Sequence, residues 1–264
     1  MSIDPQMLEV LDQVTLPAAV SGRPTTARFQ VRDYIYLATP TTALRYLVED
    51  GQFTLDESWD PGDIYQTGQT LGSAVVVMHD WFVVQTNTTS ATAPLSVTAI
   101  NQADATQQFS AQPFATFPVP ADFPTSWAPM SVSVDPDHNL IYTADSSPGV
   151  IGALQLTADG LQTVWTAHQR NTEFLALIGP RDGRVLVGTA IPPGQAPNQN
   201  TTDFVVWRDA QSGRELARTQ QPLPAMTTGT MIQPYYFGKM FYLGLDGDLI
   251  KLTVRPASSE ETFK

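Results

Sequence analysis

Apolar residues in this chain come in short runs that are separated by Gly, Pro, Asp and Asn. The runs are rich in Val, Ile, Tyr, Phe and Trp, and helical periodicity is nearly absent. Short β-branched and aromatic runs bounded by turn residues indicate β-strands joined by hairpins. Residues 6–13 alone could be drawn as a short helix, and they fit a strand equally well. The pattern therefore predicts an all-β fold.

One kind of hairpin recurs along the chain: a strand, a tight polar turn and a strongly apolar strand. Its turns are marked by Asp33, Asp80, Asp137, Asp182 and Gly238. The mean spacing is about 51 residues, and repeats at tens of residues indicate arrays or propellers. The sequence therefore predicts five repeated units.

A second hairpin follows the first in four of these units. Its turns include Asp50-Gly51, Asp159-Gly160 and Ser212-Gly213, and glycine readily adopts the positive φ that tight hairpins need. Each unit then has four antiparallel strands, the size of one propeller blade. We expect a single domain over residues 1–264. Its predicted blades are 23–68, 69–122, 123–170, 171–224 and 225–256, with a tail at 257–264.

The fifth unit is incomplete, because its third strand at 249–254 is followed by no further strand pattern. Residues 8–16 form a spare alternating segment before the first unit. We predict that this segment, within residues 1–22, closes the ring as the outer strand of the last blade. Such closure would remove an open sheet edge. The alternative is that these units belong to a longer propeller.

Two segments resemble known propeller repeats. Residues 205–216 run from an apolar strand into Asp209-Ala210-Gln211-Ser212-Gly213 and resemble the quinoprotein-like (PQQ-type) repeat. Residues 134–142 resemble the inner hairpin of YVTN-type and NHL-type propellers. The resemblance implies a propeller fold. Quinoprotein dehydrogenases are similar in repeat, but they are longer and often carry a vicinal cysteine pair beside the cofactor. This chain has no cysteine, so we expect no bound quinone and no other cofactor.

Composition excludes some functions. The chain carries 14 Lys and Arg against 26 Asp and Glu, a net charge of -12, which disfavours binding to nucleic acid or to anionic membranes. There is no apolar run long enough to span a membrane. The first residues lack the basic start and apolar run of a signal peptide. The scarcity of Lys and the abundance of Thr, Gln and Asn favour an extracytoplasmic setting for a mature or excised domain.

Polar candidates for catalysis or metal binding are few. His79, His138 and His168 are all predicted in loops, and the chain has no Gly-x-Ser-x-Gly elbow. Residues 135, 137 and 139 (Asp, Asp, Asn) alternate as calcium ligands can. The same residue types are what a hairpin turn needs, so we predict a turn and no metal site.

A hydrolase needs two or more carboxylates around the channel of a propeller. Glu173 and Asp122 are the candidates near the starts of inner strands, and one acid is not a pair. A lectin with repeated sites would carry the same residues in every blade, and these repeats diverge. The sequence therefore gives no clear support for a hydrolase or for a lectin.

Aromatic residues gather in the Pro-rich connection at 111–129. The candidate binding residues there are Phe114, Phe117, Phe123 and Trp127, with Trp127 as the anchor. Aromatic side chains are enriched at the centres of protein interfaces, although the same loop could instead cap the channel. The sequence thus predicts a non-catalytic binding or scaffold module for a protein partner. The alternative is a propeller hydrolase, of the glycosidase or lactonase kind, with channel carboxylates or a metal.

Overall fold

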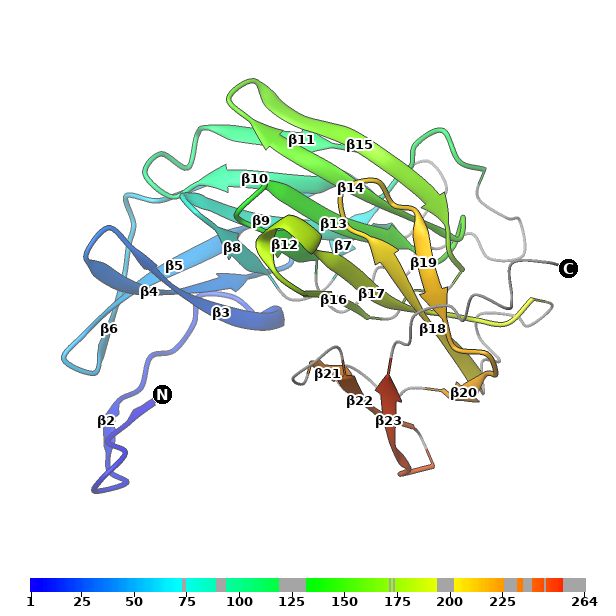
Figure 1. Cartoon of the computed structure of the whole chain (residues 1–264). Helices are drawn as coiled ribbons and strands as arrows, with labels where there is room; N and C mark the ends of the chain where they lie inside the picture. Colours follow the sequence, from blue (N-terminus) through cyan, green and yellow to red (C-terminus); the bar gives the residue numbers. More distant parts are fainter. Residues whose placement is uncertain are drawn as a thin grey trace, which may run out of the picture.

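The structure is a computed structural model that describes residues 1–72, 75–88, 94–118, 132–170, 172, 174–193, 202–225, 232–234, 239–244 and 246–253. Antiparallel β-sheets account for nearly all regular structure in these residues, with one 3-10 turn, η1 (Arg181–Gly183) (Figure 1). The prediction of an all-β fold is confirmed. No helix in the described part of the chain is long and apolar enough to cross a membrane.

Five sheets follow one another along the chain. The first contains β3 (Ser21–Phe29), β4 (Arg32–Ala38), β5 (Ala43–Glu49) and β6 (Gln52–Leu55). The second contains β7 (Gln69–Leu71), β8 (Val76–Met78), β9 (Trp81–Thr88), β10 (Val97–Asn101) and β11 (Gln108–Ala111). The third contains β12 (Ser133–Asp135), β13 (Leu140–Asp145), β14 (Val150–Thr157) and β15 (Gly160–His168). The fourth contains β16 (Leu175–Ile178), β17 (Val185–Ala190), β18 (Thr202–Asp209), β19 (Glu215–Arg218) and β20 (Leu223–Pro224). The fifth contains β21 (Ile232–Pro234), β22 (Lys239–Leu243) and β23 (Leu249–Thr253).

Strand order within each sheet largely follows chain order, so each sheet is a meander of hairpins. The hairpin units predicted from the sequence are therefore present. The first four sheets end in an outer strand, namely β6, β11, β15 and β19, whereas the fifth has three strands within the described residues. Residues 254–264, which follow β23, lie outside the described residues, so the predicted incompleteness of the fifth unit stays a prediction.

The first hairpin turns earlier than predicted. Its turn lies at Gln30 and Val31, where Gln30 has a φ of 54°, and Asp33 belongs to β4. The polar residues Arg32 and Asp33 suggested a turn, but they begin β4, because the end residues of a strand can be polar. The second turn agrees with its prediction: Asp50 and Gly51 have φ values of 50° and 77°.

Neighbouring sheets pack face to face, and their first strands β3, β8, β12 and β16 contact one another in sequence. Four clusters of buried apolar residues join sheet one to two, two to three, three to four, and four to five. The alternation of side chains along a strand divides each middle strand between two clusters. On β13, Ile141 packs toward the second sheet and Tyr142 toward the fourth. This double burial explains why the middle strands are apolar almost throughout.

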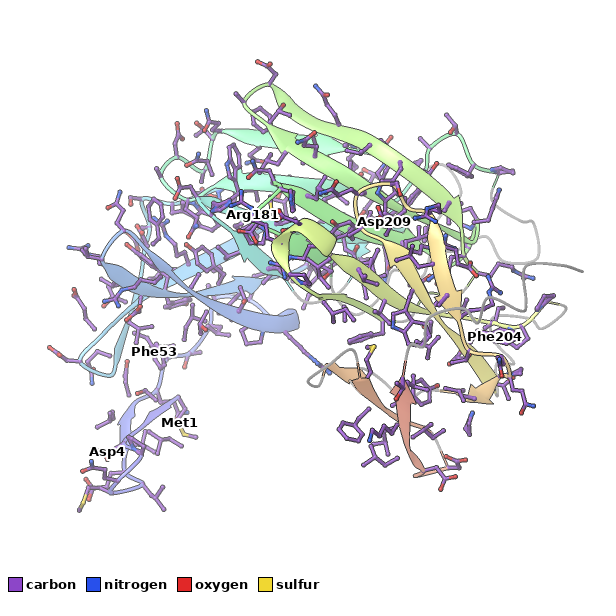
Figure 2. All side chains as sticks on the ribbon, in the orientation of Figure 1. Met1, Asp4, Phe53, Arg181, Phe204 and Asp209 are labelled. Atoms are coloured by element: carbon purple, nitrogen blue, oxygen red, sulfur yellow. The ribbon has the colours of Figure 1, made fainter. Side chains whose placement is uncertain are left out.

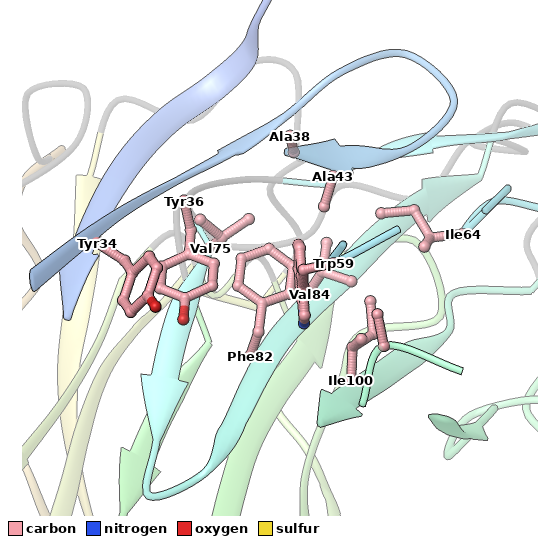
Figure 3. Packing of buried hydrophobic residues seen from close by; sticks show 11 residues of the cluster. Tyr34, Tyr36, Ala38, Ala43, Trp59, Ile64, Val75, Phe82, Val84 and Ile100 are labelled. Atoms are coloured by element: carbon pink, nitrogen blue, oxygen red, sulfur yellow. The ribbon is translucent and has the colours of Figure 1, made fainter. Parts of the chain in front are cut away.

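The cluster between the first two sheets is aromatic (Figure 3). The Tyr36 ring stacks on Phe82 with centroids 5.3 Å apart, and Trp59 meets both rings edge-on. Burial raises the pKa of Tyr36 to about 12. The Tyr36 hydroxyl donates to the Gln102 side chain, so the polar end of this ring is satisfied across the junction.

A buried arginine closes the same junction. Arg45 on β5 pairs with Asp56 at 2.6 Å, and its guanidinium lies 4.6 Å from the Tyr34 ring centroid. It also donates to the main-chain carbonyl of Gln102 in the second sheet. Burial raises the pKa of Asp56, but hydrogen bonds from Ser58 and Arg45 outweigh it and hold that pKa below its usual value.

Two tryptophan side chains also donate hydrogen bonds to main-chain carbonyls at the next sheet. Trp59 Nε1 donates to the Asn101 carbonyl at 2.9 Å, and Trp165 Nε1 donates to the Ala210 carbonyl at 3.0 Å. The Trp165 ring covers Gly213, where an added Cβ would lie 2.4 Å from the ring. Both tryptophans therefore join neighbouring sheets.

The N-terminal segment departs from its prediction. Val10–Asp12 forms β2, which pairs with β1 (Ser2–Ile3) and contacts β6 of the first sheet. The Phe53 N–H donates to Asp12 Oδ2, and Gln52 Nε2 donates to the Leu11 carbonyl. The structure thus places this segment against the first sheet and not on the outer edge of the last. Asp12 provides the physical reason, because its carboxylate accepts the main-chain N–H of Phe53 at the outer strand of the first sheet.

Removal of the Trp165 ring tests the inter-sheet contact. We expect Trp165→Ala to lower the free energy of unfolding by about 3 kcal/mol, since it removes a half-buried indole and its hydrogen bond. Gly213→Ala should destabilise the wild-type protein through the clash with this ring and the positive φ of 71°. It should cost less in the Trp165→Ala background, because only the φ strain then persists. Equal costs in the two backgrounds by urea denaturation would disprove the contact.

Acid titration tests the Arg45–Asp56 pair. A carboxyl whose pKa is lower in the folded state stabilises the protein at neutral pH and loses this effect as it is protonated. The stability difference between wild type and Asp56→Asn should therefore shrink as the pH falls from about 7 to about 3. Asp33→Asn is the control, because its ion pair with Arg28 is exposed and should contribute little. A pH-independent difference for Asp56→Asn would contradict the pairing.

Candidate functional site at the open edge of the fifth sheet

The third strand of the fifth sheet lies at an open edge. β23 pairs with β22 on one side, and no described strand pairs with its other side. In the other four sheets, the third strands β5, β10, β14 and β18 each pair with an outer strand on that side (Figure 1). Alternate residues of an antiparallel edge strand direct N–H and C=O groups outward. β23 therefore offers backbone hydrogen-bonding groups to an added strand.

A groove of about 590 Å³ lies between β23 and the outer part of the fourth sheet. Its apolar lining is formed by Trp207, Ala217, Leu223 and Leu252. These residues come from β18, β19, β20 and β23, the strands between which an outer strand of the fifth sheet would pack. The groove therefore combines an open backbone edge with an apolar floor.

The sequence of β18 and β19 produces this floor. Val205 and Trp207 share one face of β18 and pack into the cluster with the fifth sheet. Trp207 pairs in register with Ala217 on β19. Alanine is the smaller partner, so the outer strand leaves space beside the indole.

Trp207 also carries a buried polar atom without a partner. Its Nε1 is shielded from solvent and makes no hydrogen bond, whereas the indoles of Trp59 and Trp165 both donate to carbonyls. A buried donor left unpaired costs about 1–3 kcal/mol. An acceptor that reached this indole from the groove would recover that free energy.

Two cationic side chains border the groove. Lys251 is exposed on β23, and Arg218 projects from β19. The Glu215 carboxylate accepts two hydrogen bonds from Arg218, at 2.6 and 2.7 Å, which raises the pKa of Arg218. Among the residues that line the groove, Arg218 and Lys251 are charged and none is acidic, although Glu215 beside the groove neutralises Arg218. This lining favours a ligand segment that carries acidic residues.

The aromatic residues proposed from the sequence are only partly covered by the structure. Phe123 and Trp127 lie outside the described residues. Phe114 is 3% exposed and packs against Gly152 of β14, so the expectation that it lies on a binding surface is wrong in this structure. Phe117 is partly buried and meets Phe114 and His168 edge-on. Both rings fill the junction between the second and third sheets because the chain crosses it there.

Substitution of Phe114 distinguishes a ring buried in the core from a ring on a binding surface. Phe114→Ala should lower the free energy of unfolding by about 3–5 kcal/mol, as expected for a buried ring. Phe117→Ala should cost less, since that ring keeps part of its surface in solvent. Thermal and urea denaturation measure both. A Phe114→Ala protein as stable as wild type would show that the ring is not a core residue.

His79 and His138 lie in turns, as predicted, and so do Asp137 and Asn139. His168 is instead the last residue of β15, where it pairs with Val150, so the prediction of a loop there is wrong. Asp137 N–H donates to Asp135 Oδ1, His138 Nδ1 lies 2.8 Å from Asp135 Oδ2, and Asn139 has a φ of 55°. Arg184 of the fourth sheet pairs with Asp137 at 2.8 Å. Among the described residues, no group of three or more His, Cys, Asp or Glu side chains is placed to hold a metal ion.

Comparisons with known proteins give a fold and no family. No family model matches the chain, and no curated protein matches it. A protein of known structure from Lactobacillus plantarum is 15% identical, with a TM-score of 0.56 over 90% of this chain and 72% of that one. A proposed 6-phosphogluconolactonase from Bacteroides fragilis is 12% identical, with a TM-score of 0.50 over 83% of this chain and 66% of that one. A europium-containing methanol dehydrogenase is 13% identical, with a TM-score of 0.49, and the match covers 77% of this chain but 41% of the dehydrogenase.

Such low identities show the fold alone. The fold-level resemblance to β-propellers that the repeat pattern predicted is confirmed. The groove itself was not anticipated from the sequence. One sequence feature pointed to it: the last unit lacks a pattern for a fourth strand. The sequence-based prediction filled that place with residues 8–16.

Proposed function

We propose that this chain is a five-bladed propeller that acts as a non-catalytic binding or scaffold module, and that the open edge of β23 binds an extended segment of a protein partner. The observation that carries the proposal is the combination of a strand edge that no described strand pairs with and a groove of mixed polar and apolar lining at the same place. The five successive sheets support the blade count. The proposal requires no cofactor.

Binding by strand addition explains each feature of the groove. Main-chain hydrogen bonds to β23 would supply affinity, and alternate side chains of the ligand would enter the groove. Trp207, Leu223 and Leu252 offer apolar surface to those side chains. Lys251 and Arg218 favour acidic residues in the ligand, which adds selectivity at the rim.

The hydrolase alternative finds less support. The first strands β3, β8, β12, β16 and β21 contain one carboxylate, that of Asp135. Both of its oxygens are engaged, by His138 and by the Asp137 N–H. A glycosidase of the usual kind needs two carboxylates on opposite sides of the bond that it cleaves. Glu173 and Asp122 lie outside the described residues.

The Pro-rich connection at 111–129 remains part of the proposal, as a second contact with the protein partner. Trp127 and Phe123 are retained as proposed partner-binding residues, on the argument from their residue types alone. Phe114 is not retained, because its ring is buried.

Selection from a display library of random peptides of about nine residues tests the proposed function. We expect enriched peptides to alternate apolar with acidic or polar residues, as strand addition requires. Their binding should protect the amides of β23 from hydrogen exchange. Failure to enrich any peptide, or protection confined to other strands, would overturn the proposal.

A matched pair of variants controls this experiment. Gln220 is exposed and lines the groove, so Gln220→Trp should fill it and weaken peptide binding at least about tenfold. Gln162 is exposed on β15, and Gln162→Trp should leave the affinity unchanged. Equal affinities for the two variants would show that the peptides bind elsewhere.

A further inference from the structure

The N-terminal hairpin exposes an unusual amount of apolar surface. Ten large apolar side chains are exposed in the described part of the chain, and six of them lie within residues 1–11: Met1, Ile3, Met7, Leu8, Val10 and Leu11. Two more, Leu216 and Leu249, lie on the strands that flank the groove. Concentrated exposed apolar surface marks a site of association. The hairpin and the groove are therefore the two places where burial is most incomplete.

The hairpin is attached to the body by few contacts. Figure 2 shows Met1 and Asp4 on the hairpin, standing apart from the sheets, with Phe53 above them at the edge of the first sheet. The hydrogen bonds from Phe53 N–H to Asp12 (2.8 Å) and from Gln52 to the Leu11 carbonyl (2.9 Å) join β2 to β6. Beyond the hairpin, Val14 and Leu16 line a pocket on the first sheet, and a move of the segment would exchange these contacts for others in the groove.

The segment at 8–16 has the pattern that the groove requires. Its even-numbered residues are Leu8, Val10, Asp12, Val14 and Leu16, and its odd-numbered residues are polar except Leu11. On β23, Ile250 and Leu252 face inward, whereas residues 249, 251 and 253 are exposed. The even-numbered face could thus pack on the groove while the odd-numbered face meets solvent.

Charge complements the pattern. The segment carries the acidic residues Glu9 and Asp12, and the groove is bordered by Lys251 and Arg218. Asp12 lies on the otherwise apolar face, where a carboxylate needs a donor. Trp207 Nε1, buried in the groove wall without an acceptor, is such a donor.

We propose that residues 8–16 of a second copy of this chain add to β23 as the outer strand of the fifth sheet. This inference rests on the proposed function and names its ligand. Within one chain the hairpin contacts the first sheet and leaves Leu8 and Val10 exposed, whereas Val14 and Leu16 are partly buried. Reciprocal exchange between two copies would bury Leu8 and Val10, the exposed apolar residues of the even-numbered face, and pair both open edges at once. It would produce a closed, two-fold symmetric dimer, the usual form of such exchanges.

Engineered cysteines test the exchange directly, because the chain has no cysteine of its own. Thr253→Cys is placed in one copy, and Leu11→Cys, Gln13→Cys or Thr15→Cys in another; all four lie on the outward face of the proposed pairing. After mixing and mild oxidation, at least one pair should give a disulfide-linked dimer at micromolar protein. Thr253→Cys with Val164→Cys, an exposed position on β15, is the matched control and should give none.

The outcomes distinguish the possible occupants. A linked dimer in the mixture, together with a dimer mass for the wild type in sedimentation, supports the exchange. A chain that carries both cysteines and oxidises only within itself shows that its own segment fills the edge, and it overturns the second-copy assignment. No disulfide in any pair also overturns that assignment. If the peptide selection succeeds in either case, the groove still binds extended segments and only the identity of the ligand is wrong.

Discussion

A β-sheet with two apolar faces has to be covered on both, and this requirement governs the whole chain. The middle strands of the third sheet send alternate residues into two different cores, so Ile141 and Tyr142 depend on different neighbours. At two of the junctions, a side chain also donates a hydrogen bond to a main-chain carbonyl at the next sheet. These side chains are the indole of Trp165 and the buried guanidinium of Arg45. Each sheet is therefore stable only as part of the series.

The same requirement explains why the last sheet is the functional candidate. Its inner face is covered by the cluster around Val187, Trp207 and Tyr242, but its third strand lacks an outer neighbour in the described residues. The groove beside β23 combines an open edge, an apolar floor and a buried unpaired N–H. The proposed function follows from this combination, because an edge that no described strand pairs with can accept an added strand.

Much of the fold follows from the sequence, because alternation and turn residues are local signals. The Asp50-Gly51 turn is one such signal, and the structure confirms it. The first turn was misplaced because a polar pair in a strand looks like a turn. Phe114 was taken for a surface residue, since only the three-dimensional crossing of the chain shows that its ring meets Gly152. The place of residues 8–16 could not be predicted, because an alternating segment pairs with any open edge and local pattern does not choose between edges.

In the proposed exchange, the outer edge of β23 is open in one copy and is paired by another. Amide hydrogen exchange of β23, followed as a function of protein concentration, tests it most directly. In dilute protein, the outward-facing amides of β23 should exchange much faster than those of β18, which has outer partners in β19 and β20. Their protection should then rise as the concentration increases. Equal protection of β23 and β18 at every concentration would contradict the account.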